Sequence, residues 1–467
     1  ILDHPNVRFD GDTNVMLHYE RETKSLLFRP LMPMRERTTY AVVITKRLID
    51  EEGRPVRSPF RYINHASQTS ALAPLPGCLP HHGLALDDIA FTWTFTTQSV
   101  SSYFIAIRDG LRGIGPLSRL ATEFPPKLVD LDSVRDDPTR LLNVKIVPGD
   151  QLVNALSSLL PGLLGADADS PQIRSLTDGF KAIDFFVTGS YDSPQFFARK
   201  DAAGALLPLH QQTWKLNPET GAIDLPEGKA RSEKVTFWLA VPKNRNGPAP
   251  LAIAGHGYGS NKLEGLFYSG LFARQGIASI AIDCPSHGLG FGDLEIQAAE
   301  GLFTSKGLTG LFKGLRRDRA FDQTGDGVAD SGADYWTAYA THTRDMVRQS
   351  TVDYLRLVQV LETFDGTTRW EWDVNRDGEK DLAGDFNGDG VIDVGAASKL
   401  SMGGGSLGGI MSAMVGGTEP RIGVVVPISA GGGFAEIGKR AAPGGVKEAV
   451  SLRMMGPLLI TEKNAQG

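Results

Sequence analysis

Short apolar segments that alternate with an amphipathic helix constrain the fold of residues 175–467 more than any other feature. Three of them, Leu251–Ala254, Ile277–Ile282 and Ile422–Ile428, are almost continuously apolar, which is typical of parallel strands buried on both faces. The stretch 335–364 repeats apolar residues at the spacing of one helix face. Strands that alternate with helices indicate a doubly wound, mostly parallel sheet. Further strands are predicted at Ile183–Thr188, Val235–Val241 and, more weakly, Ser398–Met402.

A glycine-flanked serine follows the weaker of these strands. Residues 404–408 read Gly-Gly-Ser-Leu-Gly and lie between that strand and a predicted helix of small residues. Such a turn leaves little room for side chains beside the serine, so glycine is required there. The pattern predicts that Ser406 is a nucleophile at the carboxyl edge of the sheet, with the backbone N–H of Leu407 facing an oxyanion.

A second glycine-rich turn follows the strand Leu251–Ala254. Residues 255–259 read Gly-His-Gly-Tyr-Gly. Turns of this type supply an N–H group to an oxyanion hole, so Tyr258 and its neighbour Gly257 are the predicted donors. His256 is interpreted as a residue that fixes the loop, with proton transfer as the alternative.

The turn after the next strand is expected to form a wall of the same site. Residues 283–288 read Asp-Cys-Pro-Ser-His-Gly. We interpret Asp283 as a carboxylate that organises this loop rather than as a catalytic acid, and we place His287 and His256 in the site wall beside it.

These three motifs, which follow one another along the chain as 255–259, 283–288 and 404–408, resemble those of bacterial secreted lipases and esterases of the α/β-hydrolase superfamily. The resemblance covers residues 175–467. It implies an α/β-hydrolase domain that cleaves carboxylic esters, lipids among them, through an acyl-enzyme on Ser406.

Residues 1–100 are predicted to form a β domain. Apolar segments at Leu26–Phe28, Tyr40–Thr45 and Phe91–Phe95 alternate with turn clusters, and no long helical period interrupts them. Their sequences resemble the N-terminal Ig-like domain of bacterial surface lipases of the virulence type, which implies a β-sandwich. We therefore expect an Ig-like domain (1–100), a helical connecting region (101–174) and the hydrolase domain (175–467).

The hydrolase pattern is incomplete at its C-terminal end. The family order is serine, then an acid, then histidine, yet residues 407–467 contain no Asp and no His. Glu436 is a weak candidate for the acid, and His256 or His287 would break the order. The last two strands of the fold are also missing. We therefore expect that the chain continues beyond Gly467, or that a second polypeptide supplies the histidine and acid.

Three acidic loops share one spacing of oxygen-bearing side chains. Oxygen side chains stand at positions 1, 3, 5 and 9, glycine stands at position 6, and the carbonyl of position 7 adds a ligand, which suits Ca²⁺. Without the position-12 Glu of an EF-hand, the loops resemble the acidic repeats of dockerin- and thrombospondin-type proteins. They predict two to three Ca²⁺ ions, with solvated acidic turns as the alternative. The predicted ligands are Asp322, Thr324, Asp326, Val328 and Asp330; Asp373, Asn375, Asp377, Glu379 and Asp381; and Asp385, Asn387, Asp389, Val391 and Asp393.

The order of the predicted elements assigns these loops to opposite edges of the sheet. The first insertion (322–334) follows the fourth strand and is expected on the catalytic edge, where it would brace a lid. The tandem insertion (373–396) precedes the serine strand and is expected to be structural. The apolar residues of segment 308–315 recur at helical spacing, which fits either a core helix or a lid.

Composition excludes several classes of protein. Acidic residues (54) outnumber Lys and Arg (48), for a net charge of −6, so no nucleic-acid partner is expected. No apolar run reaches the roughly 18–20 residues that a membrane span needs. The two cysteines are too few for a disulfide framework.

Two hypotheses follow. The first is a secreted or bacterial cell-surface serine hydrolase, calcium-stabilised and acting on ester or lipid substrates. The alternative, which the missing histidine favours, is a catalytically inactive cell-surface binding or structural protein on the hydrolase scaffold.

Overall fold

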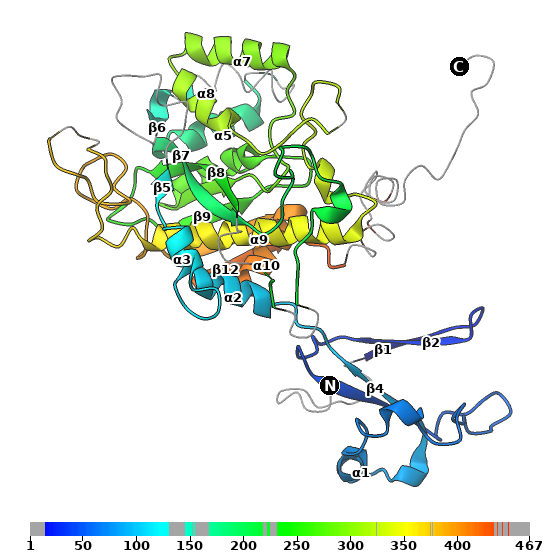
Figure 1. The fold of residues 1–467 in the computed structure, drawn as a ribbon. Helices are drawn as coiled ribbons and strands as arrows, with labels where there is room; N and C mark the ends of the chain where they lie inside the picture. Colours follow the sequence, from blue (N-terminus) through cyan, green and yellow to red (C-terminus); the bar gives the residue numbers. More distant parts are fainter. Residues whose placement is uncertain are drawn as a thin grey trace, which may run out of the picture. The chain divides into compact units, whose positions relative to one another are not determined.

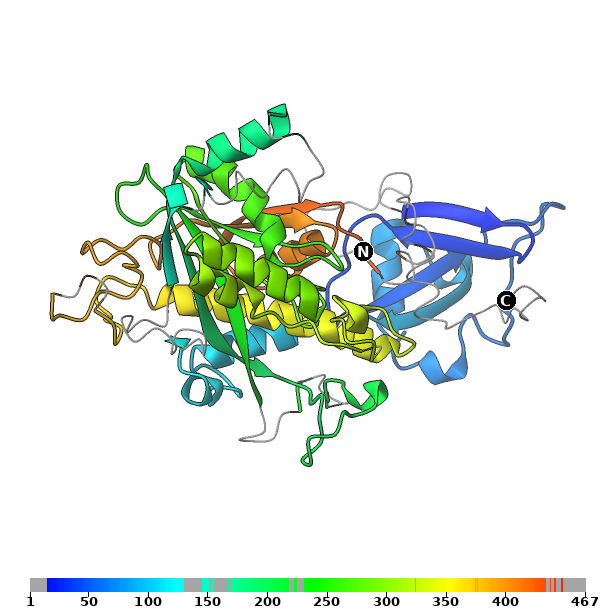
Figure 2. The same cartoon turned by 90° about the horizontal axis from the view of Figure 1, so that it is seen from above.

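The computed structural model of this chain describes residues 15–129, 145–151, 153–154, 167, 169–217, 222–224, 231–323, 325–373, 375, 377–433, 437, 441 and 447. The chain divides into two compact units, residues 1–102 and 103–467, and each is described by itself (Figures 1 and 2). Among the described residues, no helix is both long and apolar enough to cross a membrane.

The N-terminal unit contains two antiparallel pairs of strands. β1 (Val15–Glu20) pairs with β2 (Ser25–Pro30), and β3 (Thr39–Thr45) pairs with β4 (Ile89–Thr96). Between β3 and β4 the chain forms the short helical turns η1 (Ala66–Gln68), α1 (Leu75–Cys78), η2 (Leu79–His82) and η3 (Leu86–Asp88). A small core of Leu72, Leu75, Leu79 and Ile89 holds these turns against β4.

The predicted strands of this unit lie within β2, β3 and β4, but a sandwich of two packed sheets is not shown in its described part. Five prolines, at positions 55, 59, 74, 76 and 80, fall between β3 and β4. Proline has no N–H to donate to a strand ladder, so this segment turns where a sandwich would need further strands. The Ig-like assignment stays a prediction.

The second unit is built on one mixed sheet of eight strands. Its order is β12-β11-β9-β10-β8-β7-β5, and β6 also pairs with β7. β7, β9, β10, β11 and β12 run in one direction, and β5, β6 and β8 run in the other. The strands are β5 (Leu128–Val129), β6 (Lys145–Pro148), β7 (Ile183–Gln195), β8 (Arg231–Pro242), β9 (Leu251–Gly255), β10 (Ala278–Ile282), β11 (Leu400–Gly405) and β12 (Ile422–Ile428).

Helices cover both faces of this sheet. α2, α3, α9 and α10 lie on one face, and α5, α6 and α8 lie on the other (Figure 1). Along β7, Phe185 and Val187 enter the first core and Phe186 enters the second, because successive side chains of a strand point to opposite faces. The helices are α2 (Ser102–Leu111), α3 (Leu120–Glu123), α5 (Pro171–Phe180), α6 (Leu266–Arg274), α7 (Asp293–Ser305), α8 (Thr309–Arg316), α9 (Ala340–Glu362) and α10 (Leu407–Gly416), with the turns η5 (Leu209–Gln211), η6 (Lys262–Gly265) and η7 (Ala333–Tyr335).

This mixed sheet between two layers of helices is consistent with the α/β-hydrolase fold that the sequence predicts. The predicted strands of residues 175–467 are all present, and the predicted helix is α9, which begins at Ala340. The apolar face of α8 is buried in the core: Leu308, Leu311, Phe312 and Leu315 are each at most 7% exposed, so the interpretation as a core helix is confirmed.

β12 lies at one edge of the sheet. In the described part of the chain no strand pairs with its outer side. Val424 and Ile428 on this strand are each 58% exposed, and Val426 is 48% exposed. An apolar edge strand of this kind is a surface that most folded proteins cover.

Candidate active site

Ser406 lies in the turn that joins β11 to α10. Its φ of 54° and ψ of −112° place a non-glycine residue in a backbone region that L-residues seldom occupy. Its N–H donates to the carbonyl of Ile428 at 2.9 Å, which ties the turn to β12. The serine is exposed, so the strained turn presents its hydroxyl at the surface.

Glycine is required around this serine because two backbones touch. A Cβ on Gly404 would lie 2.3 Å from the carbonyl oxygen of Gly255, and one on Gly408 would lie 2.2 Å from the same atom. The end of β9 therefore packs directly on the turn that carries Ser406, which brings the two glycine-rich motifs of the sequence together.

Leu407 is the first residue of α10. The N–H groups of the first helical turn have no partner within the helix, and they carry the positive end of the helix dipole. The N–H of Leu407 therefore lies beside the serine with the polarity that an oxyanion needs.

The loop 255–259 contains two predicted oxyanion donors, Gly257 and Tyr258, and their contacts differ. The N–H of Gly257 donates to Glu264 Oε2 at 2.8 Å, so Gly257 is not an oxyanion donor in this structure, and that prediction is corrected. The physical reason is that the Glu264 carboxylate, seven residues further along the chain, already accepts this N–H. Tyr258 is half-buried, and its ring contacts those of His287 and Trp336.

His256 is held by the backbone on both sides of its ring. Nδ1 lies 2.8 Å from the carbonyl of Gly257, and Nε2 accepts the N–H of Cys284 at 3.0 Å. A ring that donates with one nitrogen and accepts with the other has no nitrogen left for a substrate. This geometry agrees with the interpretation of His256 as a loop-fixing residue.

Asp283 is paired in the interior. Its carboxylate accepts the Lys262 ammonium at 2.5 Å and the Lys262 N–H at 2.6 Å, and both side chains are at most 2% exposed. Such a pair anchors the loop after β10 to the loop after β9, because a charge left unpaired at this depth would be costly. The position fits a carboxylate that organises the loop.

His287 is fully buried among aromatic rings. Nδ1 lies 3.0 Å from the carbonyl of Pro285, and Nε2 has no hydrogen-bond partner among the described residues. Burial lowers the pKa of His287 well below its usual value, so the ring is neutral.

Among the described residues, no hydrogen bond joins the Ser406 side chain to a histidine. Besides His256 and His287, one further histidine is buried in the described part of the chain. This is His342, whose Nδ1 lies 2.7 Å from the carbonyl of Gln212 and whose Nε2 lies 3.6 Å from Asp334 Oδ1. Glu419, another glutamate that follows Ser406 in the sequence, pairs with Arg112 at 3.0 Å. Glu436 lies outside the described residues.

A buried arginine, Arg319, connects these loops to neighbouring elements. Arg319 binds Asp353 Oδ2 on α9 at 2.6 Å and Glu233 Oε1 on β8 at 2.7 Å. It also donates to the carbonyl of Asp283 at 3.2 Å, and its own N–H donates to the carbonyl of His287 at 3.0 Å. One side chain thus joins the loop after β10 to the sheet and to α9.

The segment that follows the first acidic loop contacts the site directly. Ser331 Oγ lies 3.2 Å from the carbonyl of Ser260 and accepts the Gly288 N–H at 3.2 Å. Gly332 has φ +78°, and a Cβ there would lie 2.8 Å from His287 Nε2 and 3.0 Å from the ring of Tyr258. The first loop is therefore coupled to both site loops.

The three acidic loops have the same local hydrogen bonds. The carboxylate at position 1 accepts the N–H of the position-6 glycine at 2.8, 2.9 and 2.7 Å in the first, second and third loop. The carboxylate at position 5 accepts the N–H of position 7 at 2.9, 2.8 and 2.9 Å. The glycines Gly327, Gly378 and Gly390 have φ between 84° and 93°, as the sharp turn requires. Thr324 lies outside the described residues.

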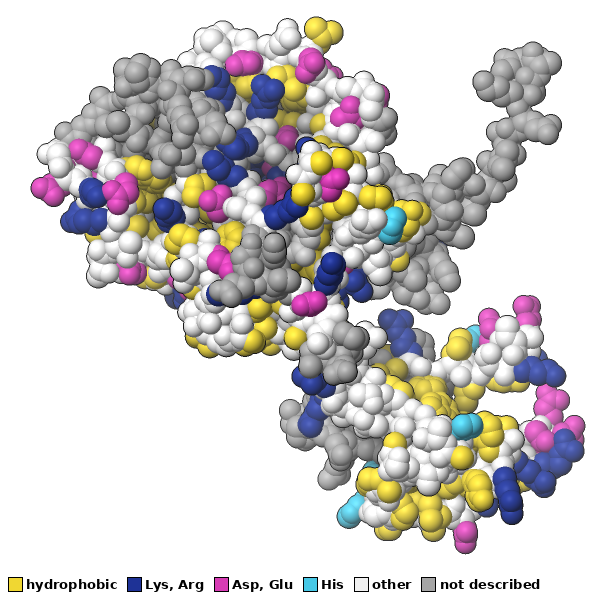
Figure 3. Space-filling model, viewed as in Figure 1, with side chains coloured by type: hydrophobic (Ala, Val, Ile, Leu, Met, Phe, Trp, Pro, Cys, Tyr) yellow, Lys and Arg dark blue, Asp and Glu magenta, His cyan; other side chains and the backbone are white. Residues whose placement is uncertain are grey.

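The tandem loops lie at the amino ends of β9 and β11, away from Ser406. The Ala249 N–H, just before β9, donates to the Asp393 carbonyl at 2.8 Å. In Figure 1 these loops are the gold turns at the left, and Figure 3 shows carboxylates gathered there beside Lys and Arg side chains.

The third loop is the most deeply buried. Asp385 and Asp393 are fully buried, and Arg245 Nη2 lies 2.7 Å from Asp393 Oδ1. Burial raises the pKa of Asp393 to about 7, and the charges of Asp385 and Asp389 add to the rise although Arg245 opposes it. Closely spaced oxygen side chains of this kind fit a hard cation such as Ca²⁺. No cluster of three His, Cys, Asp or Glu side chains arranged to hold a metal occurs in the part of the chain that the structure describes.

Four residues of the site have no motif in the sequence that marks them: Lys262, Glu264, Arg319 and Ser331. Each contacts a loop that lies at least seven residues away along the chain. Only Glu264, seven residues beyond Gly257 in the same glycine-rich segment, lies close enough in sequence to be predicted as a contact of its loop.

No protein-family model matches this chain, and no curated protein matches it in sequence. Similar solved structures include an acetyl xylan esterase from Paenibacillus sp. R4, with 17% identity and a TM-score of 0.29 over 72% of this chain and 71% of that one. Acetyl xylan esterase 1 from Thermoanaerobacterium sp. JW/SL YS485 has 17% identity and a TM-score of 0.26 over 49% and 55%. A cold-adapted esterase from an Arctic intertidal metagenomic library has 14% identity and a TM-score of 0.21 over 50% and 58%. The chain thus spans between 55% and 71% of these proteins, and at such scores the function has to be argued from its own residues.

Proposed function

We propose that this protein is a secreted, calcium-stabilised serine hydrolase that cleaves carboxylic esters, lipids among them, through an acyl-enzyme on Ser406. The observation that carries the proposal is the backbone of Ser406, held at φ 54° between a strand and the start of α10. A protein with no use for this hydroxyl gains nothing from a strained, exposed serine.

The chemistry follows from the positions of the donors. The hydroxyl oxygen of Ser406 attacks the ester carbonyl carbon and gives its proton to a general base, and the carbonyl oxygen becomes an oxyanion that accepts the N–H groups of Leu407 and Tyr258. The carbon–oxygen bond to the alcohol then breaks, and the alcohol takes up the proton. Water releases the acid from Ser406 by the same steps.

The general base of this proposal is a histidine outside this chain. The three buried histidines point their nitrogens at other groups or at no partner, as described above. We assign the acid, like the histidine, to a group outside this chain.

Calcium enters the proposal as a structural ion. The repeated hydrogen bonds of the three loops support binding of two to three Ca²⁺ ions by the side chains at positions 1, 3, 5 and 9. Such sites stay filled where calcium is abundant, which supports a secreted or cell-surface location.

The test is hydrolysis of short-chain p-nitrophenyl esters by the complete protein. Ser406→Ala is expected to lower kcat/KM at least about 1,000-fold, because the nucleophile is lost. Ser401→Ala on β11 is the matched control, and it should keep most of the activity. Full turnover by Ser406→Ala would refute the proposal.

A second function has one specific observation in its favour. Because the buried histidines His256, His287 and His342 have their ring nitrogens at other groups or without a partner among the described residues, the chain also fits a hydrolase scaffold kept for binding or structure at the cell surface. A fluorophosphonate probe discriminates the two. One adduct at Ser406 of the complete protein supports the enzyme, and no adduct supports the binding protein.

A further inference from the structure

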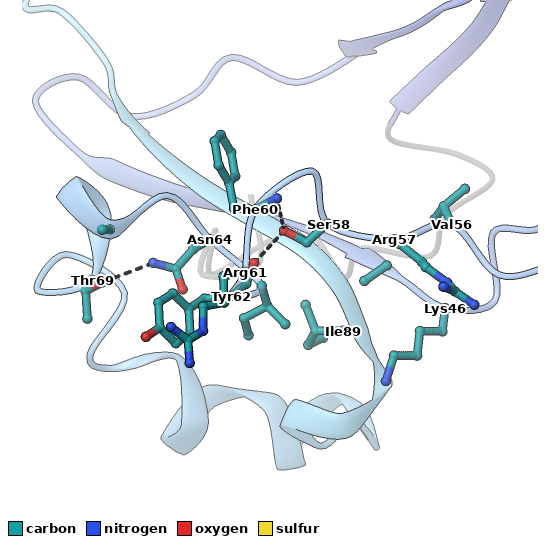
Figure 4. Close-up of a pocket in the computed structure, with 13 residues that line it drawn as sticks. Lys46, Val56, Arg57, Ser58, Phe60, Arg61, Tyr62, Asn64, Thr69 and Ile89 are labelled. Carbon is teal, nitrogen blue, oxygen red and sulfur yellow. Dashed lines mark hydrogen bonds between the residues drawn. The ribbon is translucent and has the colours of Figure 1, made fainter.

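The N-terminal unit contains a pocket of about 700 Å³ between the end of β3, the segment 56–69 and the start of β4. It is formed within this unit alone. Its floor is apolar and includes Ile63, Ile89 and Ala90. Figure 4 shows Lys46 and Arg57 together at one end, and Arg61, Tyr62 and Asn64 at the other.

The charged side chains that line the pocket are all cationic. They are Lys46, Arg57 and Arg61, and no Asp or Glu is among the lining residues. Lys46 Nζ donates to the backbone carbonyl of Asp87 at 2.5 Å, and the guanidinium of Arg61 lies 5.8 Å from the ring of Tyr62. In the described part of the chain neither Arg57 nor Arg61 forms an ion pair.

A nearby arginine shows the contrast. Arg54 is held by Asp50 at 2.8 Å and by Glu52 at 2.6 Å, so its charge is neutralised locally. Among the described residues the cations of the pocket have no such carboxylate partners, and an anionic ligand would supply them. Guanidinium groups bind carboxylates and sulfates with two parallel hydrogen bonds, which favours ligands with planar or multidentate anionic groups.

Two aromatic side chains stand exposed at the pocket. Phe60 is 45% exposed and Tyr62 is 61% exposed, although most aromatic rings of a folded protein are buried. Phe60 is fixed by contacts with His65 at 5.0 Å and Phe91 at 5.9 Å between ring centroids. The amide of Asn64 and the hydroxyl of Ser58 also line the pocket, where Asn64 donates to Thr69 Oγ1 at 3.2 Å and Ser58 accepts the Phe60 N–H at 3.1 Å.

We propose that this pocket binds an acidic oligosaccharide, a short sugar chain that carries carboxylate or sulfate groups. Sugar rings present an apolar face that packs on an aromatic ring, and their anionic groups would pair with Arg57 and Arg61 at the two ends. A long nucleic acid is disfavoured by the net charge of −6 over the whole chain. A membrane surface is disfavoured because the cations line a concavity rather than a convex apolar face.

The test is calorimetric titration of the full chain with a heparin-derived tetrasaccharide at physiological ionic strength. The double variant Arg57→Ala/Arg61→Ala is expected to weaken binding at least about tenfold, since two charge-assisted contacts are lost. Tyr62→Ala should weaken it about threefold to tenfold, while Tyr62→Phe, which keeps the ring, should bind as the wild type does. Arg47→Ala is the matched control, because Arg47 is exposed next to Lys46 but does not line the pocket.

Several results would overturn the proposal. Equal weakening by Arg47→Ala would mean that only general surface charge is sensed. Equal affinity for uncharged cellotetraose would mean that the cations are not used. If the tetrasaccharide does not bind, but the chain binds phosphatidylglycerol vesicles and the Arg57→Ala/Arg61→Ala change abolishes that binding, the pocket would be assigned to a membrane surface instead.

Discussion

The first and third acidic loops share a motif and differ in their surroundings. Asp322 and Asp385 both stand at position 1, and both accept backbone N–H groups of their own loop. Asp322 is exposed, whereas Asp385 is fully buried. The motif therefore fixes the local turn, and the neighbouring elements decide how much of the fold depends on it.

The two loops are coupled to different parts of the second unit. The third loop is joined to the chain before β9 by Arg245 and by the Ala249 N–H, at the edge away from Ser406. The first loop continues into Ser331 and Gly332, which contact the loops around the candidate site. We infer that a cation in the third loop stabilises the fold, and that one in the first loop stabilises the site.

The largest expected effect comes from removing calcium. With a chelator in excess, two vacated sites should cost about 5 kcal/mol, and Tm should fall by about 5–10 °C, because the carboxylates of the loops then repel one another. A thermal unfolding scan with and without chelator measures the shift. Added calcium should restore the original midpoint, and an unchanged midpoint would rule out calcium in both loops.

The second prediction compares the two position-1 residues. Asp385→Ala should lower the free energy of unfolding by about 3 kcal/mol in saturating calcium, because buried N–H groups lose their acceptor. Asp322→Ala removes an exposed acceptor and should cost about 1 kcal/mol. Urea titration measures both, and equal losses would contradict the claim that burial separates the loops.

The third prediction concerns the link from the first loop to the site. Gly332→Ala should lower kcat/KM for ester substrates roughly 10- to 100-fold, because its Cβ would push on His287 and Tyr258 and displace the donor loop. Gly307→Ala is the matched control: Gly307 has a similar φ of +71° but nothing within 4 Å of its Cβ. Equal activity of the two variants would show that the first loop does not position the site.

The smallest expected effect is a dependence of the free energy of unfolding on pH through Asp318, which lies near the candidate site. Burial raises the pKa of Asp318 to about 6, so between pH 4 and 6 the folded chain binds this proton and the unfolded chain does not. Stability therefore falls as pH rises through 6. Asp318→Asn should remove this loss and gain roughly 1 kcal/mol at pH 8, with no gain at pH 4. Urea titrations at both pH values measure the difference, and a gain independent of pH would refute the assignment.

Local chemistry let the sequence predict the turn at Ser406 and the three acidic loops. Glycine at positions 404 and 408 indicates that another backbone segment lies close. A carboxylate at a fixed distance along the chain from a glycine indicates a sharp turn in which the carboxylate accepts the glycine N–H. These features depend on residues within about a dozen positions of one another, so their pattern survives in the sequence. β9 and β10 could be predicted in the same way, because these buried strands are short and almost wholly apolar.

What the sequence left open depends on contacts between distant segments. The acceptance of the Gly257 N–H by Glu264 removed one predicted oxyanion donor, and the buried pair of Lys262 and Asp283 has no periodic signature. Asp385 is buried whereas Asp322, at the same position of its loop, is exposed, and this difference also follows only from what packs around each loop. The sequence by itself determined the turns, strands and candidate nucleophile, because these rest on neighbours along the chain. Only the tertiary structure decided which polar groups meet, because the free energy of a buried polar group is set by partners that folding brings together.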